Sequence, residues 1–466
     1  MSDHQEPVLL NTFINGKKKV KIIFHKGVLV WDNERPPLAQ HTVPIENVLS
    51  VQQNYLKSSS PSLRRQIDPN HFTIHYAEKS TDDKWVYKSL TLKHLDALQV
   101  ASWVKTLQNH LLKFSKRPKH LLLFVNPFGG KRNAMQIYEK YGKGLFTLAG
   151  VEVTVNVSQR KDQIRDFLIN HNLDMFDSIA CVGGDGTVSE LFNGLVLREC
   201  RLKGIDANDI NQELPKPRKP IGIIPGGSTD TIAYCIHGTT DPTTAVLHII
   251  FGDILGLDLV SVYDEHTLLR LYASVLSYGY LGDVAYHSDQ YRWMGPHRYD
   301  YSGFKKLILN RGYKGEIAIY TDTKEVQGID CKGNCDVCKN ETLHKEKASC
   351  KWETLKGKFF MISGANISCA CSRSPKVKHT SVVNNLRLLL RLSSADAVIE
   401  DLPFVETYSA REFCFRAADG AASKWNCDGE VQHQTNIRAK VRCQLLTIYS
   451  RGCQKNTGTK TKCCGF

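Results

Sequence analysis

Short apolar runs alternate with turn residues along the N-terminal part of the chain, residues 8 to 114. The runs are rich in β-branched and aromatic residues, which is typical of β-strands. The predicted strands are Val8–Phe13, Lys18–His25, Val28–Trp31, Ile45–Gln52, Phe72–Ala77 and Trp85–Thr91. In the segment that follows, Leu95–Leu112, apolar residues recur at helical spacing. This region therefore predicts a small β-rich module that ends in one helix.

The pattern changes after a polar, proline-containing linker at residues 115–119. Predicted strands and helices then alternate, as they do in an α/β domain. The strands are His120–Val125, Val151–Val157, Ser178–Val182 and Ile221–Ile224, and the helices are Gln136–Leu148, Asp162–Asn170 and Val188–Arg198. Residues 201–220 are polar and contain three prolines, so they predict a surface loop.

Residues 258–453 are again rich in strand patterns, and they predict a second lobe built from an antiparallel sheet. Its strand candidates are Arg270–Ser277, Glu316–Thr321, Lys358–Ser363, Glu412–Ala417 and Arg438–Tyr449. Residues 454–466 form a polar tail. The predicted domains are a β-rich module at 1–114, an α/β lobe at 120–257 and a β-rich lobe at 258–453.

Composition narrows the class of protein. A chain of 466 residues is too long for one core, which agrees with two or three domains. The 61 Lys and Arg residues exceed the 47 Asp and Glu residues and give a net charge of +14. This excess favours an acidic membrane surface or a phosphorylated ligand as partner. We expect no nucleic-acid partner, because the basic residues are dispersed and no recognition module is present.

The N-terminus has no signal-peptide pattern, and the chain has no run of about 18 apolar residues. We therefore expect a cytoplasmic protein whose membrane contact is peripheral. Its 15 cysteines are expected to be reduced thiols, because most are scattered through strand and helix patterns.

Glycine-rich turns follow three of the predicted α/β strands, at residues 125–131, 180–190 and 221–230. Glycines after a strand let backbone amides approach a phosphate closely, and open α/β sheets bind ligands at the carboxyl ends of their strands. The first turn lacks the Gly-Lys-Ser/Thr ending of a Walker motif. In the second, three glycines leave Asp185 with little steric cover. A structural turn needs only one glycine, so we interpret this turn as functional.

These turns resemble those of the diacylglycerol kinase catalytic domain, which sphingosine and ceramide kinases share. The chain most resembles the ceramide kinase family in four further segments, which are residues 291–300, 331–338, 367–375 and 425–430. The N-terminal module resembles a pleckstrin-homology domain, with Trp103 as its helix tryptophan. In that module Lys17, Lys18, Lys19 and Lys21 suit an anionic headgroup, although a solvated strand edge explains them as well.

The resemblance implies an ATP-dependent lipid kinase that phosphorylates ceramide or a related lipid, with Mg²⁺ as cofactor. It implies that ATP is bound by Asn126, Pro127, Phe128, Gly129, Gly130, Ser158, Gln159, Arg160, Lys161, Asp162, Glu190, Gly227, Ser228, Thr229, Arg292, Arg298, Asp428, Gly429 and Glu430. It places the lipid near Gly183, Gly184, Asp185, Gly186 and Asp283. Asp185 is the predicted general base for the lipid hydroxyl, and Asp428 is the alternative. The membranes implied are the Golgi and the plasma membrane.

Two further motifs, one of cysteines and one of leucines, suggest binding sites. Cys331, Cys335 and Cys338 have a spacing that suits structural Zn²⁺, with unconnected reduced thiols as the alternative. Residues 386–392 alternate leucines with two arginines, which suits calmodulin or, equally, a core helix.

One departure from the family pattern follows Pro375. A strand segment with Asp-Gly and then Asp-Leu is absent between Lys378 and Ser381. This absence leaves open a related sphingoid-base or diacylglycerol kinase, or a catalytically impaired lipid-binding homologue.

Overall fold

The computed structural model describes residues 8–33, 40–55, 66–80, 83–129, 132–294, 297–309, 311–321, 351–367, 377–378, 402–408, 410–418 and 423–452. The chain divides into two compact units. The first comprises Met1–Leu121, Ile137–Thr154 and Asp241–Asp253, and the second comprises Leu122–Gln136, Val155–Thr240 and Ile254–Phe466.

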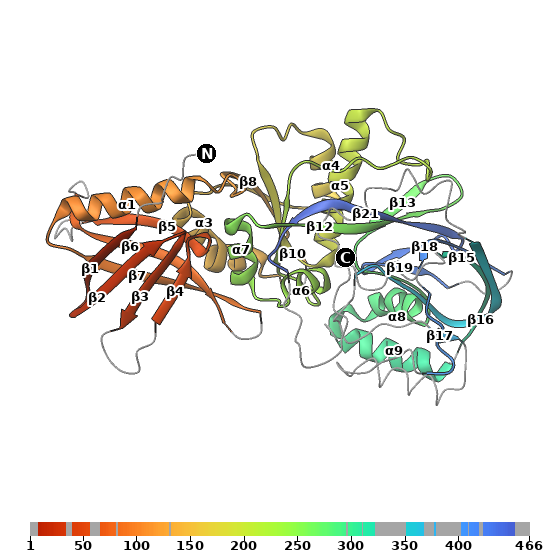
Figure 1. Ribbon diagram of the computed structural model, residues 1–466. Coiled ribbons are helices and arrows are strands. Elements are labelled where there is room, and N and C mark those ends of the chain that lie inside the picture. The colour runs from red at the N-terminus through yellow and green to blue at the C-terminus, as the bar shows by residue number, and fades with distance from the viewer. Residues whose placement is uncertain are drawn as a thin grey trace. The chain divides into compact units, whose positions relative to one another are not determined.

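The first unit is built on a seven-stranded antiparallel sheet with the order β4-β3-β2-β1-β7-β6-β5 (Figure 1). Its strands are β1 (Leu9–Asn15), β2 (Lys18–His25), β3 (Val28–Asn33), β4 (Gln40–Pro44), β5 (Val48–Tyr55), β6 (Ile67–Lys79) and β7 (Trp85–Lys93). A single turn of 3₁₀ helix, Ile45–Asn47, precedes β5. The sequence predicted six of these strands and missed β4, a short segment with several polar residues.

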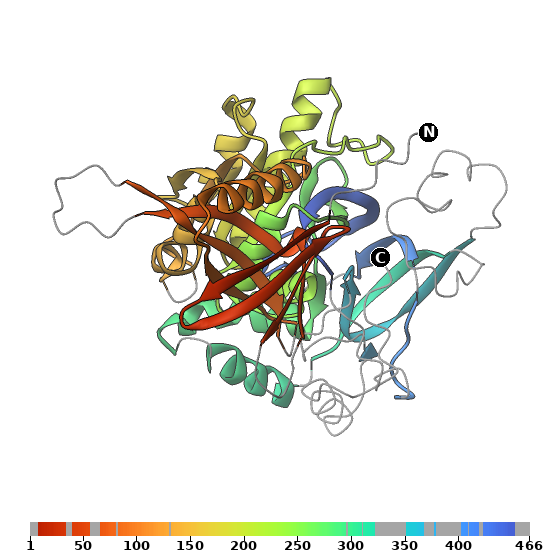
Figure 2. The same cartoon turned by 60° about the vertical axis from the view of Figure 1, so that its left-hand side comes forward.

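Helix α1 (Ala97–Leu112) packs across this sheet (Figure 1, Figure 2). It begins at Asp96, whose carboxylate accepts the Leu98 N–H at 2.8 Å and so caps the helix. Its apolar face is buried, and the Trp103 ring lies 5.2 Å from that of Phe13 on β1. The predicted pleckstrin-homology-like architecture, with Trp103 in its core, is confirmed.

Two segments from later in the chain complete the first unit. Helix α7 (Pro242–Phe251) starts with proline after the capping residue Asp241. The Trp85 N–H at the start of β7 donates to Thr244 Oγ1 at 3.0 Å, and the Trp85 ring lies 5.3 Å from that of Phe251. The other segment includes a π-helical turn, Tyr138–Lys143, between α2 (Ala134–Ile137) and α3 (Gly144–Leu148). The sequence predicted one regular helix over this stretch.

In the second unit, four strands form the first half of a mixed sheet. They are β8 (His120–Val125), β9 (Glu152–Val157), β10 (Ser178–Gly183) and β11 (Ile221–Pro225), in the order β11-β10-β8-β9. Strands β10 and β11 are parallel and buried along their whole length, which explains their continuous apolar sequence. Helices α4 (Gln163–Asn170), α5 (Asp185–Lys203) and α6 (Thr231–His237) belong to this half.

The rest of the sheet is mainly antiparallel and forms the β-rich lobe. Its strands are β12 (Ile254–Tyr263), β13 (Leu268–Tyr272), β14 (Val275–Gly279), β15 (Tyr313–Thr321), β16 (Lys351–Ala365), β17 (Val377–Lys378), β18 (Ala410–Ala417), β19 (Trp425–Cys427), β20 (Glu430–Gln432) and β21 (Ile437–Tyr449). Strand β21 joins the two halves, because it pairs in parallel with β11 and antiparallel with β12 and β18.

This lobe also contains helices that the sequence did not predict. These are α8 (Tyr280–Ser288), a 3₁₀ segment (Asp289–Met294) and α9 (His297–Leu309), with α8 and α9 packed side by side (Figure 1). Both helices are short and rich in aromatic residues, so their sequences do not distinguish helix from strand. Among the described helices, none combines the length and the apolar character needed to cross a bilayer.

Candidate active site

Three strand-end turns meet at one edge of the sheet formed by β8, β10 and β11. The Asn126 N–H, after β8, donates to the Val182 carbonyl at 3.1 Å, and the Gly226 N–H donates to the Gly183 carbonyl at 3.1 Å. A Cβ atom on Gly227 would lie 2.5 Å from the Gly184 Cα, so these two turns pack backbone against backbone. The glycines are therefore needed for close approach, and the three turns lie together.

Asp185 opens helix α5 inside this cluster. Its carboxylate accepts the N–H of Thr231 at 3.2 Å and that of Ile232 at 3.0 Å, both from the first turn of α6. Burial raises the pKa of this carboxyl to about 6, an effect that the two N–H groups oppose and the nearby charge of Asp428 reinforces. Asp185 is thus held in place and titrates close to neutral pH.

Asp428 has a different environment, in the turn between β19 and β20. Its carboxylate accepts the backbone N–H groups of Ala273 at 2.7 Å, Ser274 at 3.0 Å and Val275 at 2.9 Å. The Ser274 hydroxyl donates to the same carboxylate at 2.5 Å. With its oxygens occupied and only 4% of the residue exposed, Asp428 anchors the turn that carries Gly429 and Glu430.

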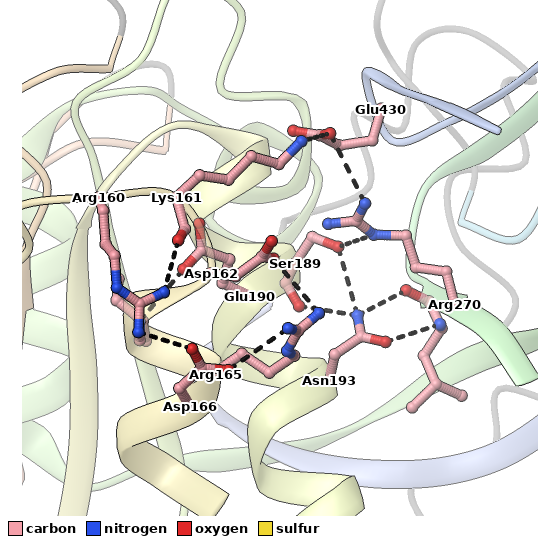
Figure 3. A network of polar contacts seen from close by, with 12 residues as sticks. Arg160, Lys161, Asp162, Arg165, Asp166, Ser189, Glu190, Asn193, Arg270 and Glu430 are labelled. Atoms are coloured by element: carbon pink, nitrogen blue, oxygen red, sulfur yellow. Dashed lines mark hydrogen bonds and ion pairs between the residues drawn. The ribbon is translucent and has the colours of Figure 1, made fainter.

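Glu430 joins three segments that are far apart in sequence (Figure 3). Its Oε2 lies 2.6 Å from Lys161 Nζ, in the loop before α4, and 3.8 Å from Arg270 Nη1 on β13. Arg270 Nε in turn donates to the Ser189 hydroxyl on α5 at 3.0 Å. Glu430 therefore lies among cations beside the first turns of α5.

The loop after β9, residues 158–162, is fixed by hydrogen bonds at both ends. The Ser158 N–H donates to the Val125 carbonyl at 2.9 Å, and the Gln159 N–H donates to Gln163 Oε1 at 2.6 Å. Glu190 on α5 accepts the Ile164 N–H at 3.2 Å, and burial raises its pKa. This loop and Glu190 thus lie together.

Sequence reasoning missed a second part of the network, which holds α5 to β13 (Figure 3). Asn193 donates to the Leu271 carbonyl at 3.0 Å and accepts the Leu271 N–H at 2.9 Å. The one available signal was a polar residue within the buried run Leu191–Val196. Arg270 and Ser189 carried no comparable signal, because their partners come from distant segments.

Some of the predicted site residues do not belong to the Asp185 cluster. Asp283 on α8 accepts hydrogen bonds from the hydroxyls of Tyr313 and Ser423, and Lys306 Nζ lies 3.7 Å from its carboxylate. This buried group does not contact the Asp185 cluster by any described hydrogen bond or ion pair. Other predicted features fall outside the described part of the chain. These are Gly130, the Arg292 side chain, the three clustered cysteines, residues 386–392 and the departure after Pro375. The described residues include no group of three or more potential metal ligands.

Two family models match parts of the chain. Residues 9–107 match the model of the ceramide kinase PH domain, and residues 120–262 match that of the diacylglycerol kinase catalytic domain. The ceramide kinase of Homo sapiens is 32% identical over 89% of this chain and 89% of its own length. The chain belongs to the ceramide kinase family. Both predicted resemblances are thereby confirmed for this family member.

Other relatives of this ceramide kinase family member differ in coverage. The ceramide kinase of Arabidopsis thaliana is 27% identical over 82% of this chain and 81% of its own length. Sphingosine kinase 1 of the same plant is 28% identical over 56% of this chain and 54% of its own. A solved structure, a putative diacylglycerol kinase from Bacillus anthracis str. Sterne, is 14% identical, covers 72% of this chain and 98% of its own, and has a TM-score of 0.48.

Proposed function

We propose that this chain transfers the γ-phosphoryl group of ATP to the primary hydroxyl of ceramide, giving ceramide 1-phosphate and ADP. The observation that carries the proposal is the similarity to a ceramide kinase along nine-tenths of both chains, including the N-terminal module. The match to a sphingosine kinase covers a much smaller share of the chain. This coverage favours ceramide over a sphingoid base, and family membership favours an active kinase over an impaired homologue.

Asp185 is the proposed general base. It accepts the hydroxyl proton of the lipid, the lipid oxygen forms a bond to the γ-phosphorus, and the bond from that phosphorus to the bridging oxygen of ADP breaks. A carboxylate whose pKa is about 6 is mostly ionised at neutral pH and still binds a proton readily. Asp428 suits this role less well, because four hydrogen bonds already occupy its oxygens.

The remaining turn residues are proposed to bind the nucleotide. Backbone N–H groups of the turns at residues 126–130 and 227–229, together with the loop at 158–162, suit the phosphates. Lys161 and Arg270 add positive charge next to Glu430. Arg292 and Arg298 remain proposed phosphate contacts by resemblance.

A divalent metal fits the chemistry of this donor set, because Mg²⁺ prefers carboxylate oxygens. Glu430 is the residue that would hold it together with the nucleotide phosphates, whereas hydrogen bonds already occupy the oxygens of Asp428. Bound Mg²⁺ would neutralise charge on the phosphates. Structural Zn²⁺ at the clustered cysteines and calmodulin binding at residues 386–392 stay separate proposals, as do the Golgi and plasma membranes as the sites of action.

The lipid chain is proposed to enter the β-rich lobe. An apolar cavity there is lined by side chains from three strands, including Ile317, Ile319, Phe359, Met361 and Phe413. Asp283 hydrogen-bonds to Tyr313 on β15, the strand that also supplies two of the lining residues. We therefore propose that Asp283 supports the wall of the lipid pocket.

The test is a transfer assay with purified protein, labelled ATP, and ceramide, sphingosine or diacylglycerol presented separately in neutral detergent micelles. The proposal predicts labelled ceramide 1-phosphate and at least tenfold less product from the other two lipids. Preferential labelling of sphingosine or diacylglycerol would overturn the ceramide assignment, and no labelling of any lipid would overturn the kinase activity.

A further inference from the structure

Cations gather on the outer face of the β-rich lobe, away from the Asp185 cluster in sequence and in contacts. A shallow hollow on strands β15, β16 and β18 is lined by Lys314, Lys356, Lys358 and Arg416, which we call the basic face. All four residues are exposed. The hollow is also lined by four small residues, Gly315, Gly357, Ala417 and Ala418.

The register of the strands places like charges next to one another. Lys314 lies directly opposite Lys358, and Glu316 lies between Lys356 and Arg416 on the neighbouring strands. Like charges at facing positions destabilise an antiparallel pair. The one carboxylate here, Glu316, pairs with Lys356 at 3.0 Å. Within the part of the chain that the structure describes, Lys314, Lys358 and Arg416 have no carboxylate within salt-bridge distance.

Aromatic residues continue the same face along the strands. Tyr320 and Trp352 are partners in the pairing of β15 with β16, and their rings lie 5.3 Å apart. Each is six residues from a lysine of the basic face, an even number, so the side chains point to the same side of the sheet. Trp352 is 46% exposed. Tryptophan and tyrosine are the residues that favour the boundary between water and lipid headgroups.

We propose that the basic face docks the catalytic domain on the anionic headgroups of a lipid bilayer. The proposal rests on the proposed function in one respect, because a kinase for a membrane lipid must work at the membrane surface. Charge complementarity supports this occupant, since unpaired cations on a shallow exposed face suit many headgroups at once. Two more observations favour it over a free phosphate or a nucleic acid: the open hollow and the exposed Trp352 next to Tyr320.

The test compares two charge-reversal variants of the full chain. The first is Lys314→Glu with Lys358→Glu and Arg416→Glu, and the matched control is Lys203→Glu with Lys216→Glu and Arg218→Glu, also exposed cations of the second unit. Binding is measured by co-sedimentation with phosphatidylcholine vesicles that contain 30% phosphatidylserine and with pure phosphatidylcholine vesicles. Both variants are also made with Lys17, Lys18, Lys19 and Lys21 changed to alanine, which removes the basic hairpin of the N-terminal module.

Each lost cation weakens binding to the anionic vesicles about fivefold, and each new glutamate adds repulsion, so the triple variant should bind them at least about a hundredfold less tightly. The control is expected to fall less than fivefold, and binding to neutral vesicles to stay the same. Equal losses in the two variants, or a fall on neutral vesicles as well, would overturn the proposal. A variant that keeps its vesicle binding but no longer binds a labelled oligonucleotide would point to nucleic acid instead and would also overturn it.

Two controls keep the outcomes separate. In neutral detergent micelles, both variants should transfer phosphate to ceramide at a rate within twofold of the parent. A parent that is inactive in these micelles would contradict the proposed function. The result with vesicles does not depend on that outcome. If the triple variant shows a lower thermal midpoint, the milder pair Lys314→Ala with Lys358→Ala is used. That pair should bind anionic vesicles about 25-fold less tightly, and unchanged binding would overturn the proposal.

Discussion

The carboxylate of Asp185 accepts the backbone N–H of Ile232 at 3.0 Å, which links the start of α5 to the start of α6. This contact fixes the direction of the carboxylate, while burial raises its pKa to about 6. If Asp185 is the base, it must be unprotonated to accept the hydroxyl proton. We therefore expect kcat/KM for ceramide to fall about tenfold per pH unit below about pH 6 and to be flat from pH 7 to 8.

A first substitution tests the same residue. Asp185→Asn keeps the size of the side chain and removes the base, so kcat should fall by about 10² to 10⁴. ATP affinity, measured by titration calorimetry, should change little. Unchanged turnover, or a pH profile of the parent with no fall near pH 6, would remove Asp185 from this role.

Ionisation of Asp185 is also predicted to lower the stability of the folded protein. Its pKa is raised in the folded state, so the folded protein binds a proton more tightly than the unfolded chain does. Its ionisation therefore destabilises the fold increasingly as the pH rises from about 4 to about 6. The thermal midpoint of Asp185→Asn relative to the parent should rise over this range and stay level above it. A constant difference from pH 4 to 7 would contradict the raised pKa.

The contact between two glycine turns predicts a packing defect. In Gly227→Ala the new Cβ would lie 2.5 Å from the Gly184 Cα, so we expect a loss of about 1–3 kcal/mol in the free energy of unfolding. The matched control is Gly144→Ala, which is helical and has nothing within 4 Å of the added Cβ. That change should stabilise by about 0.5–1 kcal/mol. Denaturant unfolding measures both, and equal effects would show that the two turns separate easily.

Asp428 is expected to stabilise the fold and not to take part in proton transfer. Asp428→Asn removes the charge that accepts three backbone N–H groups and places an amide N–H among donors. The free energy of unfolding should fall by about 2 kcal/mol. The exposed Asp174→Asn is the control and should stay within about 0.5 kcal/mol. An Asp428→Asn protein as stable as the parent but without turnover would favour Asp428 as the base.

Arg270 predicts an effect on nucleotide binding. The guanidinium of Arg270 contacts both Ser189 and Glu430, which the ammonium of a lysine cannot do. In Arg270→Lys, Glu430 should therefore be held less firmly in place. We expect KM for MgATP to rise about five- to tenfold with the thermal midpoint little changed. Arg201→Lys, which alters an exposed hydrogen bond to Asn170 near the C-terminal end of α5, should leave KM within twofold. A double variant with Glu430→Gln should be no worse than Glu430→Gln alone, and additive effects would separate the two residues.

The sequence predicted those parts of the site whose signal is local. The glycines around Asp185 and those at 226–227 mark tight turns after apolar strands, and the structure places these turns together. The partners of Asp428 are about 150 residues away in the chain, and Arg270 reaches Ser189 only because β13 packs against α5. Such contacts depend on tertiary pairing, which leaves no local pattern.

The same reason explains the errors in the fold. Strands β10 and β11 are buried on both faces and read as continuous apolar runs, so they were predicted within one residue at each end. Helices α8 and α9 mix aromatic, glycine and charged residues, and their helical form depends on packing against each other and the sheet. Sequence patterns without a clear period do not predict such elements.

The proposed reaction of this chain is phosphorylation of the primary hydroxyl of ceramide. The most direct test offers ceramide, 1-deoxyceramide and sphingosine together at equal mole fraction in one neutral detergent micelle, with labelled ATP, and identifies the products by mass spectrometry. We predict ceramide 1-phosphate as the main product, no phosphorylated 1-deoxyceramide because it lacks the primary hydroxyl, and about 10² to 10⁴ times less product in Asp185→Asn. Labelled 1-deoxyceramide, or sphingosine 1-phosphate as the main product, would contradict the proposed reaction.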